Sequence, residues 1–121
     1  MLLELHGNKK TDMITIKNNI IPFKGFTALT LWPFIFVRKD SEKYYTDIVN
    51  RHETIHGEQQ KEMFILLFLV WYGIEWLVKL CYYGNAMTAY WNISFEREAY
   101  QNQNDLAYLD IRKHYSWIKY L

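Results

Sequence analysis

The chain has 121 residues, half of them hydrophobic and 18% aromatic, which excludes a disordered chain and predicts a single domain over residues 1–121. Its 14 basic and 13 acidic residues are interspersed and give a formal net charge of +1, so no nucleic-acid partner is expected. The single cysteine precludes an intramolecular disulfide, and the first ten residues lack the order of a signal peptide, so the sequence predicts a cytoplasmic protein.

The first forty residues favour β-strands. Residues 13–16 form one predicted strand, residues 17–19 a turn, and Ile20 and Ile21 a short continuation. A further strand is predicted over residues 26–37, interrupted by Pro33. Since proline is tolerated in a sheet only at an edge or a bulge, residues 27–36 are expected at a sheet edge.

Residues 52–56 read His-Glu-Thr-Ile-His, the H-E-x-x-H pattern. Residues four apart on an α-helix lie on the same face, so His52 and His56 can reach one metal ion, and Glu53 can reach a metal-bound water without being a ligand. A helix is expected over residues 45–63, with Thr46 as its N-terminal cap. Gly57 weakens this helix slightly and is expected to leave room over the metal.

A catalytic zinc needs a third protein ligand. Cys81 lies in an apolar stretch and is expected to be a small buried hydrophobe, whereas His6 and His114 near the termini remain open candidates. The best candidate segment is residues 93–100, where Glu96 and Glu98 open a predicted helix. Asn92 and Ser94 are its expected capping residues.

The two segments together resemble the gluzincins, zinc metallopeptidases in which H-E-x-x-H is completed by a glutamate from a later helix. The closest pattern is the E-x-E-A-D motif of the heat-shock and CAAX-prenyl-protease group of membrane metallopeptidases, matched here by residues 96–100 with Tyr100 in place of the aspartate. The chain is also similar to small uncharacterised bacterial proteins with a zincin-like core.

This resemblance implies a Zn²⁺ site made by His52, His56 and Glu96, with Glu53 as the general base that hydrolyses a peptide or protein substrate. It implies a zincin-like α+β fold, in which a small N-terminal β-sheet precedes three to four helices, including the H-E-x-x-H helix and the glutamate-bearing helix. The predicted edge at residues 27–36 would then face the substrate.

The resemblance also raises the question of which residues support the ligands. The family's aspartate orients a ligating histidine, a role that Tyr100 could fill through its phenol oxygen or that could pass to Asp105 or Asp110. Glu98 projects about 200° away from Glu96 around the helix, so only one of the two can face the metal. Further candidates to support a ligand or to donate to an oxyanion lie in the C-terminal segment: Tyr108, Arg112, His114 and Tyr115.

Residues 63–83 form a long apolar segment. As a helix it would be roughly 31 Å long, enough to cross a bilayer. Glu75 near its middle argues against a span, and Glu75 and Lys79 are spaced for an ion pair on a water-facing stripe. A central core helix is therefore preferred over a membrane span, with association with a membrane surface as a third hypothesis.

An alternative function remains open at this point. The chain could be a metal-binding or metal-free structural or interaction protein on a zincin-like scaffold, associated with a membrane or not. Its five tryptophans and ten tyrosines could also leave aromatic surface for a homodimer. The two hypotheses differ in whether a cleft opens onto the metal.

Overall fold

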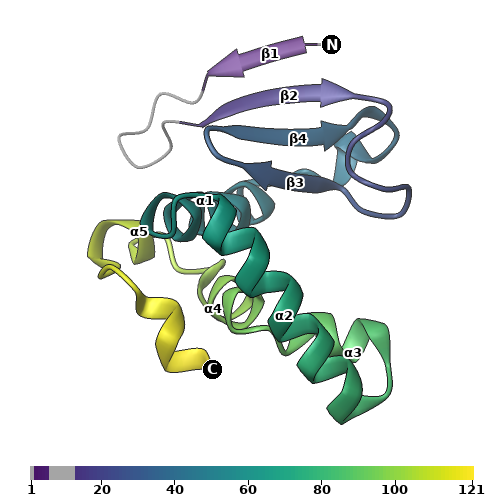
Figure 1. Cartoon of the computed structure of the whole chain (residues 1–121). Coiled ribbons are helices and arrows are strands. Elements are labelled where there is room, and N and C mark those ends of the chain that lie inside the picture. Colours follow the sequence, from purple (N-terminus) through teal and green to yellow (C-terminus); the bar gives the residue numbers. More distant parts are fainter. Residues whose placement is uncertain (1, 6–12) are drawn as a thin grey trace.

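A four-stranded sheet and a set of helices on one side of it make up the fold, so the expected α+β class is confirmed (Figure 1). The computed structural model describes residues 2–5 and 13–121. The strands are β1 (Leu2–Leu5), β2 (Ile14–Asn18), β3 (Ala28–Leu31) and β4 (Phe34–Arg38), in the order β1-β2-β4-β3. The β2–β4 pair is parallel, and the other two pairs are antiparallel.

The strand predicted over residues 26–37 is in fact a hairpin. Its two arms are β3 and β4, and Trp32 and Pro33 lie in the turn between them. Only β3 lies at a sheet edge, because β4 pairs with β2 on its other side. The predicted edge is therefore right for its first half and wrong for its second.

The end of β2 also differs from the prediction. The strand continues to Asn18, whose side-chain oxygen accepts the backbone N–H groups of Ile20 (2.8 Å) and Ile21 (2.6 Å). These two bonds bend the chain out of the sheet, so Ile20 and Ile21 are part of a loop and not of a strand.

Helix α1 (Asp47–Glu62) carries the H-E-x-x-H motif and follows a short 3-10 helix, η1 (Lys39–Tyr44). As predicted, the Thr46 side chain caps its first turn by accepting the Val49 N–H. Gly57 lies against the sheet: a Cβ at this position would come within 3.0 Å of the Met13 side chain. The expectation that Gly57 leaves room over the metal is therefore wrong, and its small size instead lets α1 approach Met13 and Trp32.

After α1 the chain breaks at Phe64 and Ile65, whose φ angles are 54° and 51°. The later elements are α2 (Leu66–Tyr83), α3 (Ala86–Trp91), α4 (Ser94–Asn102), α5 (Tyr108–Ile111) and a final 3-10 helix, η2 (Ser116–Tyr120). Helix α2 ends at Gly84 in the left-handed region, and the Asn85 side chain caps α3.

The expectation that residues 63–83 form a central core helix is wrong. Of the residues of α2 only Phe68 and Glu75 are buried, and the rest are half-buried or exposed. Within the described part of the chain, α2 is also the one helix long and apolar enough to cross a membrane, by its length and composition. Most of its apolar side chains therefore do not contribute to the core, to which α2 adds only Phe68 and the half-buried Tyr72 and Trp76.

The start of α4 depends on a residue of α2 and not on its expected caps. Glu75 accepts the backbone N–H of Ser94 and, at 2.5 Å, its hydroxyl, so a buried carboxylate binds the positive end of α4. Lys79 donates to the Asn92 carbonyl at 3.0 Å. Glu75 and Lys79 thus both hold the segment before α4, and the predicted water-facing ion pair between them is not how the structure uses these charges.

Hydrophobic packing around α4 completes the helical layer. Phe95 is fully buried, with ring centroids 4.4 Å from Phe68 of α2 and 4.7 Å from Trp117 of η2. One turn further along the helix, Ala99 packs with Ile55 of α1. Helix α4 is therefore fixed against α1, α2 and the C-terminal segment, and these contacts set the position of Glu96.

Candidate metal centre

Three side-chain atoms from α1 and α4 meet at one point in the helical layer. His52 Nε2 lies 3.1 Å from Glu96 Oε1, His56 Nε2 lies 3.0 Å from the same oxygen, and the two nitrogens are 3.2 Å apart. All three residues are buried, and among the described residues they form the one group arranged to hold a metal ion. The structure thus brings together His52, His56 and Glu96, the three residues predicted from the sequence to bind a metal ion.

The orientation of the His56 ring follows from its neighbours. Gln59 donates through its amide nitrogen to Glu98 Oε1 (3.0 Å) and to the Phe95 carbonyl (3.1 Å), so its amide oxygen must face the other way. That oxygen lies 2.8 Å from His56 Nδ1 and can only accept. Nδ1 is therefore the protonated nitrogen of neutral His56, and the lone pair of Nε2 points toward His52 and Glu96.

His52 is held in the same way by a different amide. Its Nδ1 lies 2.8 Å from Gln103 Oε1, at the end of α4, which leaves Nε2 for the shared point. Tyr100 does not supply this hydrogen bond: its ring packs edge-on against His52, with centroids 4.4 Å apart, and its hydroxyl bonds to the Tyr90 hydroxyl at 3.0 Å. The supporting role expected of Tyr100 therefore belongs to Gln103.

The two aspartates proposed as substitutes for Tyr100 lie elsewhere. Asp105 accepts the backbone N–H of Ala107 at 2.9 Å, within its own turn. Asp110 is exposed on α5. Both residues come after the end of α4, and neither contacts His52 or His56.

Three lone pairs so close together repel one another unless a cation lies among them. Zn–N bonds of 2.0–2.1 Å and Zn–O bonds of similar length in a tetrahedral arrangement place neighbouring ligand atoms about 3.3 Å apart. The separations of 3.0–3.2 Å between the three atoms are close to this value. Two imidazole nitrogens and one carboxylate oxygen are also a ligand set that suits zinc, so the residues fit this ion.

Without a metal ion, a proton takes the cation's place. Burial by itself would lower the pKa of His56, but the charges of Glu96 and Glu53 and the hydrogen bonds of Glu96 and Gln59 raise this pKa from 6.5 to about 9. Burial would likewise raise the pKa of Glu96, but the charge and hydrogen bonds of the two histidines hold it well below 4.5. The site therefore favours an ionised glutamate facing a positive charge.

Glu53 lies next to the ligands without joining them. It is buried, and the Thr30 hydroxyl of β3 lies 2.8 Å from its Oε1. Burial raises the pKa of Glu53 above 4.5, against the lowering effect of the positive charges of His56 and His52. A carboxylate so placed is a stronger base than one in water.

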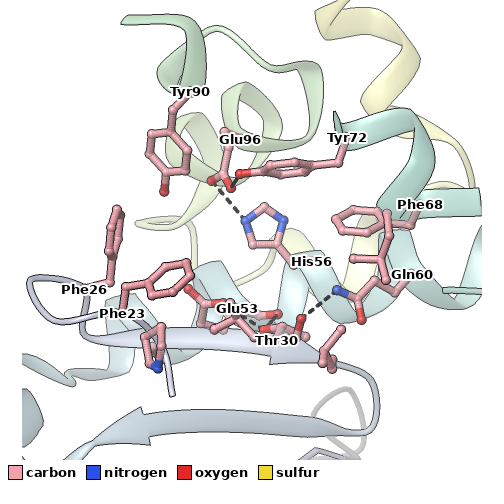
Figure 2. A pocket seen from close by; sticks show the side chains of 15 residues that line it. Phe23, Phe26, Thr30, Glu53, His56, Gln60, Phe68, Tyr72, Tyr90 and Glu96 are labelled. Carbon is pink, nitrogen blue, oxygen red and sulfur yellow. Dashed lines mark hydrogen bonds and ion pairs between the residues drawn. The ribbon is translucent and has the colours of Figure 1, made fainter. Parts of the chain in front are cut away.

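A cavity of about 290 Å³ opens beside these residues, between β3 on one side and α2 and α4 on the other. Figure 2 shows Glu53, His56 and Glu96 on its wall, with Phe23 and Phe26 opposite Phe68. Most of its remaining lining is apolar and comes from the loop before β3, from β3 itself and from α2: Pro22, Ala28, Leu29, Leu31, Leu69 and Tyr72. Glu53 and two of the three candidate ligands, His56 and Glu96, thus line one largely apolar cavity.

Glu98 contacts the site on the side away from the cavity. It is fully buried and binds Arg112, the Tyr108 hydroxyl (2.6 Å) and, as described, the Gln59 amide. Glu98 therefore acts on His56 through Gln59, while Tyr108 and Arg112 hold Glu98 and are turned away from the cavity.

The remaining candidates from the sequence lie away from the cavity. The His114 side chain is 88% exposed and lies 3.6 Å from Glu62, and the Tyr115 hydroxyl donates to the Glu62 carbonyl at 3.2 Å. Both therefore contact the C-terminal end of α1, and neither lines the cavity. Cys81 is exposed on α2, contrary to its expected burial, and His6 lies outside the described residues.

Several residues of the site were not predicted. Gln59 follows His56 by three positions and Gln103 follows Glu96 by seven, so helical spacing could have indicated both. Tyr72, which donates to Glu96 Oε2 at 2.7 Å, comes from α2, and no local pattern indicates this contact.

No protein-family model, curated protein or solved structure matches this chain. The geometry of the site therefore carries the functional argument by itself.

Proposed function

We propose that this protein is a zinc-dependent metallopeptidase with a zincin-like arrangement of a sheet edge, a motif helix and a later glutamate-bearing helix. The observation that carries the proposal is the triangle of His52 Nε2, His56 Nε2 and Glu96 Oε1, with sides of 3.0–3.2 Å. These three residues would hold the ion. When bound, zinc acts as a Lewis acid toward a carbonyl oxygen and lowers the pKa of a coordinated water.

Glu53 is the general base in this proposal. Its carboxylate lines the same cavity as His56 and Glu96, and its contact with the Thr30 hydroxyl fixes one of its oxygens. The carboxylate takes a proton from the attacking water and returns it to the leaving amine. Its burial favours this role, since a raised pKa brings the base nearer to neutral pH.

The free edge of β3 is the proposed binding site for an extended peptide. Thr27 and Arg38 share a backbone hydrogen bond of 3.0 Å, so the backbone groups of Ala28 and Thr30 point to the open edge. Gln60 already uses the Thr30 carbonyl, at 2.8 Å. The segment of substrate that pairs with β3 is therefore short and lies alongside Ala28 and the Thr30 N–H.

The alternative of a purely structural metal site is less consistent with the cavity. A structural zinc is closed by four protein ligands, whereas a catalytic zinc has three and leaves one position open. Three ligating residues are found among those described, and two of them line a cavity. This arrangement favours an accessible metal.

Metal analysis and peptide hydrolysis test the proposal. We expect one zinc per chain in the wild type and a loss of zinc in His52→Ala and in Glu96→Ala. Glu53→Gln should retain zinc and hydrolyse a mixed peptide library about 10²–10⁴-fold more slowly, the usual contribution of a general base. Glu58→Gln changes a glutamate on the same helix, outside the cavity lining, and serves as the matched control.

Two results would contradict different parts of the proposal. One zinc per chain in His52→Ala would exclude His52 as a ligand. Undiminished hydrolysis by Glu53→Gln would exclude Glu53 as the base, while zinc binding without hydrolysis by the wild type would favour the structural alternative.

A further inference from the structure

The charged residues of α2 face the protein, whereas most of its apolar residues face outward. The residues that contact the body of the protein form one stripe, namely Phe68, Tyr72, Glu75, Trp76 and Lys79, with Leu69 at the cavity and Trp71 against Trp117 at its margins. Both charged residues of the helix lie in this stripe and bind the segment before α4. This is the reverse of a helix at the surface of a protein in water, which directs its apolar stripe inward.

The outward side of α2 is uniformly uncharged. Its large hydrophobic side chains with no contact to the body of the protein are exposed by 51–79% along the length of the helix. They are Leu66, Leu67, Val70, Ile74, Leu77, Val78 and Tyr82. At 100° per residue these positions cover an arc of about 160° around the helix, which we call the outer arc of α2.

The width of the outer arc distinguishes a bilayer from a protein partner. A helix that packs on another protein buries a stripe of about 100°, so a second copy of the chain would leave about a third of the arc in water. A helix lying in the plane of a membrane surface keeps a charged face toward water, whereas the charged residues of α2, Glu75 and Lys79, bind the segment before α4. Hydrocarbon, in contrast, can surround the whole arc.

The dimensions of α2 agree with this occupant. Its 18 residues extend over about 27 Å, close to the roughly 30 Å of a hydrocarbon core. Tyr82 and Tyr83 lie at its C-terminal end, where aromatic side chains favour the boundary between lipid and water. We propose that α2 inserts its outer arc into the hydrocarbon core of a lipid bilayer, a proposal that does not depend on the metal chemistry.

Spin labels on single cysteines test this inference. Cys81 is the only cysteine and is exposed, so Cys81→Ser gives a cysteine-free background for labels at Val70, Ile74 and Val78 of the outer arc. A label at Leu106, 81% exposed between α4 and α5, is the matched control. The full chain is reconstituted from detergent into vesicles of phosphatidylcholine and phosphatidylglycerol, and label collisions with oxygen and with a water-soluble nickel chelate are compared.

The expected result is that nickel reaches the three outer-arc labels at least ten-fold less than it reaches the label at position 106, while oxygen collisions rise at the outer arc. Equal nickel access at all four positions would overturn the proposal. So would a dimer in detergent-free buffer in which paired labels at position 74 broaden each other's spectra, since a second copy would then occupy the arc.

Vesicle partitioning provides a second measurement. The double variant Val70→Glu/Ile74→Glu should partition into vesicles at least ten-fold more weakly than the wild type, and 0.5 M salt should not release the wild type, because the outer arc carries no charge. Leu106→Glu/Ile111→Glu adds the same charge elsewhere on the surface and should partition as the wild type does. Because all four positions are exposed, circular dichroism should show each variant folded; equal partitioning of the two double variants would overturn the proposal.

Discussion

The amide of Gln59 determines which nitrogen of His56 faces the other two ligand atoms. Its nitrogen is committed to Glu98 and the Phe95 carbonyl, so its oxygen holds the Nδ1 proton of His56. The carboxylate of Glu98, two positions after Glu96, is thereby linked through Gln59 to the position of the proton on His56. The affinity for metal should depend on this link even though Gln59 does not touch the ion.

Replacing Gln59 by methionine tests the link. The methionine fills a similar volume but cannot accept the Nδ1 proton, so we expect zinc affinity to fall about 10–100-fold, as is usual when a partner of a ligating histidine is removed. Competition with a chelator measures the change. Gln101→Met, an exposed position on α4, is the control, and an unchanged affinity in Gln59→Met would show that His56 is oriented without the amide.

At the scale of single residues, the sequence predicted those that helical spacing or a motif identifies. His52 and His56 share a face of α1 because they are four positions apart, and Glu96 follows from the resemblance of its segment to a known motif. Tyr72 and Thr30 could not be predicted, because their contacts with Glu96 and Glu53 depend on how α2 and β3 pack.

At the scale of the elements, α2 supports α4 through a single buried carboxylate. Glu75 accepts both the N–H and the hydroxyl of Ser94, two positions before Glu96. The element that provides the third ligand is therefore anchored by a helix that contributes no ligand.

Glu75→Ala should lower the free energy of unfolding by about 1–3 kcal/mol, because the Ser94 N–H loses a charged acceptor in a buried position. Chemical denaturation of the metal-free protein measures this loss. Ser94→Ala removes only the hydroxyl and should cost about 1 kcal/mol or less. If the two variants were equally stable, the N–H bond to Glu75 would have no role in holding α4.

The two glycines inside helices provide another comparison. A Cβ at Gly73 would meet nothing within 4 Å, so Gly73→Ala should raise the free energy of unfolding by up to about 1 kcal/mol through helix propensity. A Cβ at Gly57 would lie 3.0 Å from the end of the Met13 side chain, so Gly57→Ala should gain less or lose stability. Thermal unfolding of both variants measures the difference between the two sites. An equal gain in stability would mean that the Met13 side chain moves aside without cost.

Local signals predicted some elements well. Thr46 fixes the start of α1 to the residue, since its side chain caps the helix through a contact within one turn. The hairpin of β3 and β4 and the exposure of α2 escaped prediction, because strand pairing and burial depend on distant parts of the chain. The apolar run of α2 indicates that its side chains are shielded from water, but it does not indicate whether protein or lipid covers them.

For the whole molecule, the charge of the metal centre links stability to pH. The contribution of His56 to the stability of the metal-free protein is complete below its ordinary pKa of 6.5 and is lost as the pH rises through about 9. The contribution of Glu96, whose pKa is lowered, is present above 4.5 and is lost as the pH falls below that value.

The midpoint of thermal unfolding of the metal-free protein should therefore fall between pH 6.5 and 9, as His56 loses its proton, and should fall below pH 4.5, as Glu96 gains one. Zinc competes with the proton on His56, so its stabilising effect should increase between pH 6.5 and 9. Scanning calorimetry with and without zinc measures both trends. His56→Ala should remove the fall between pH 6.5 and 9, and a persistent fall in that variant would assign the pH dependence to another group.

The residues at the break between α1 and α2 are not those that would give the highest stability in water. Phe64 and Ile65 have φ angles of 54° and 51°. Glycine adopts positive φ angles without steric cost, whereas a β-branched residue such as Ile65 is strained there. Phe64 is nevertheless 80% exposed, so in water it gains little in return for that backbone. A chain selected only for stability in an aqueous buffer would carry glycine or asparagine at this break and charged residues on the outer arc. If α2 inserts into lipid as proposed, those replacements should give a protein that needs no detergent and keeps the candidate metal centre unchanged.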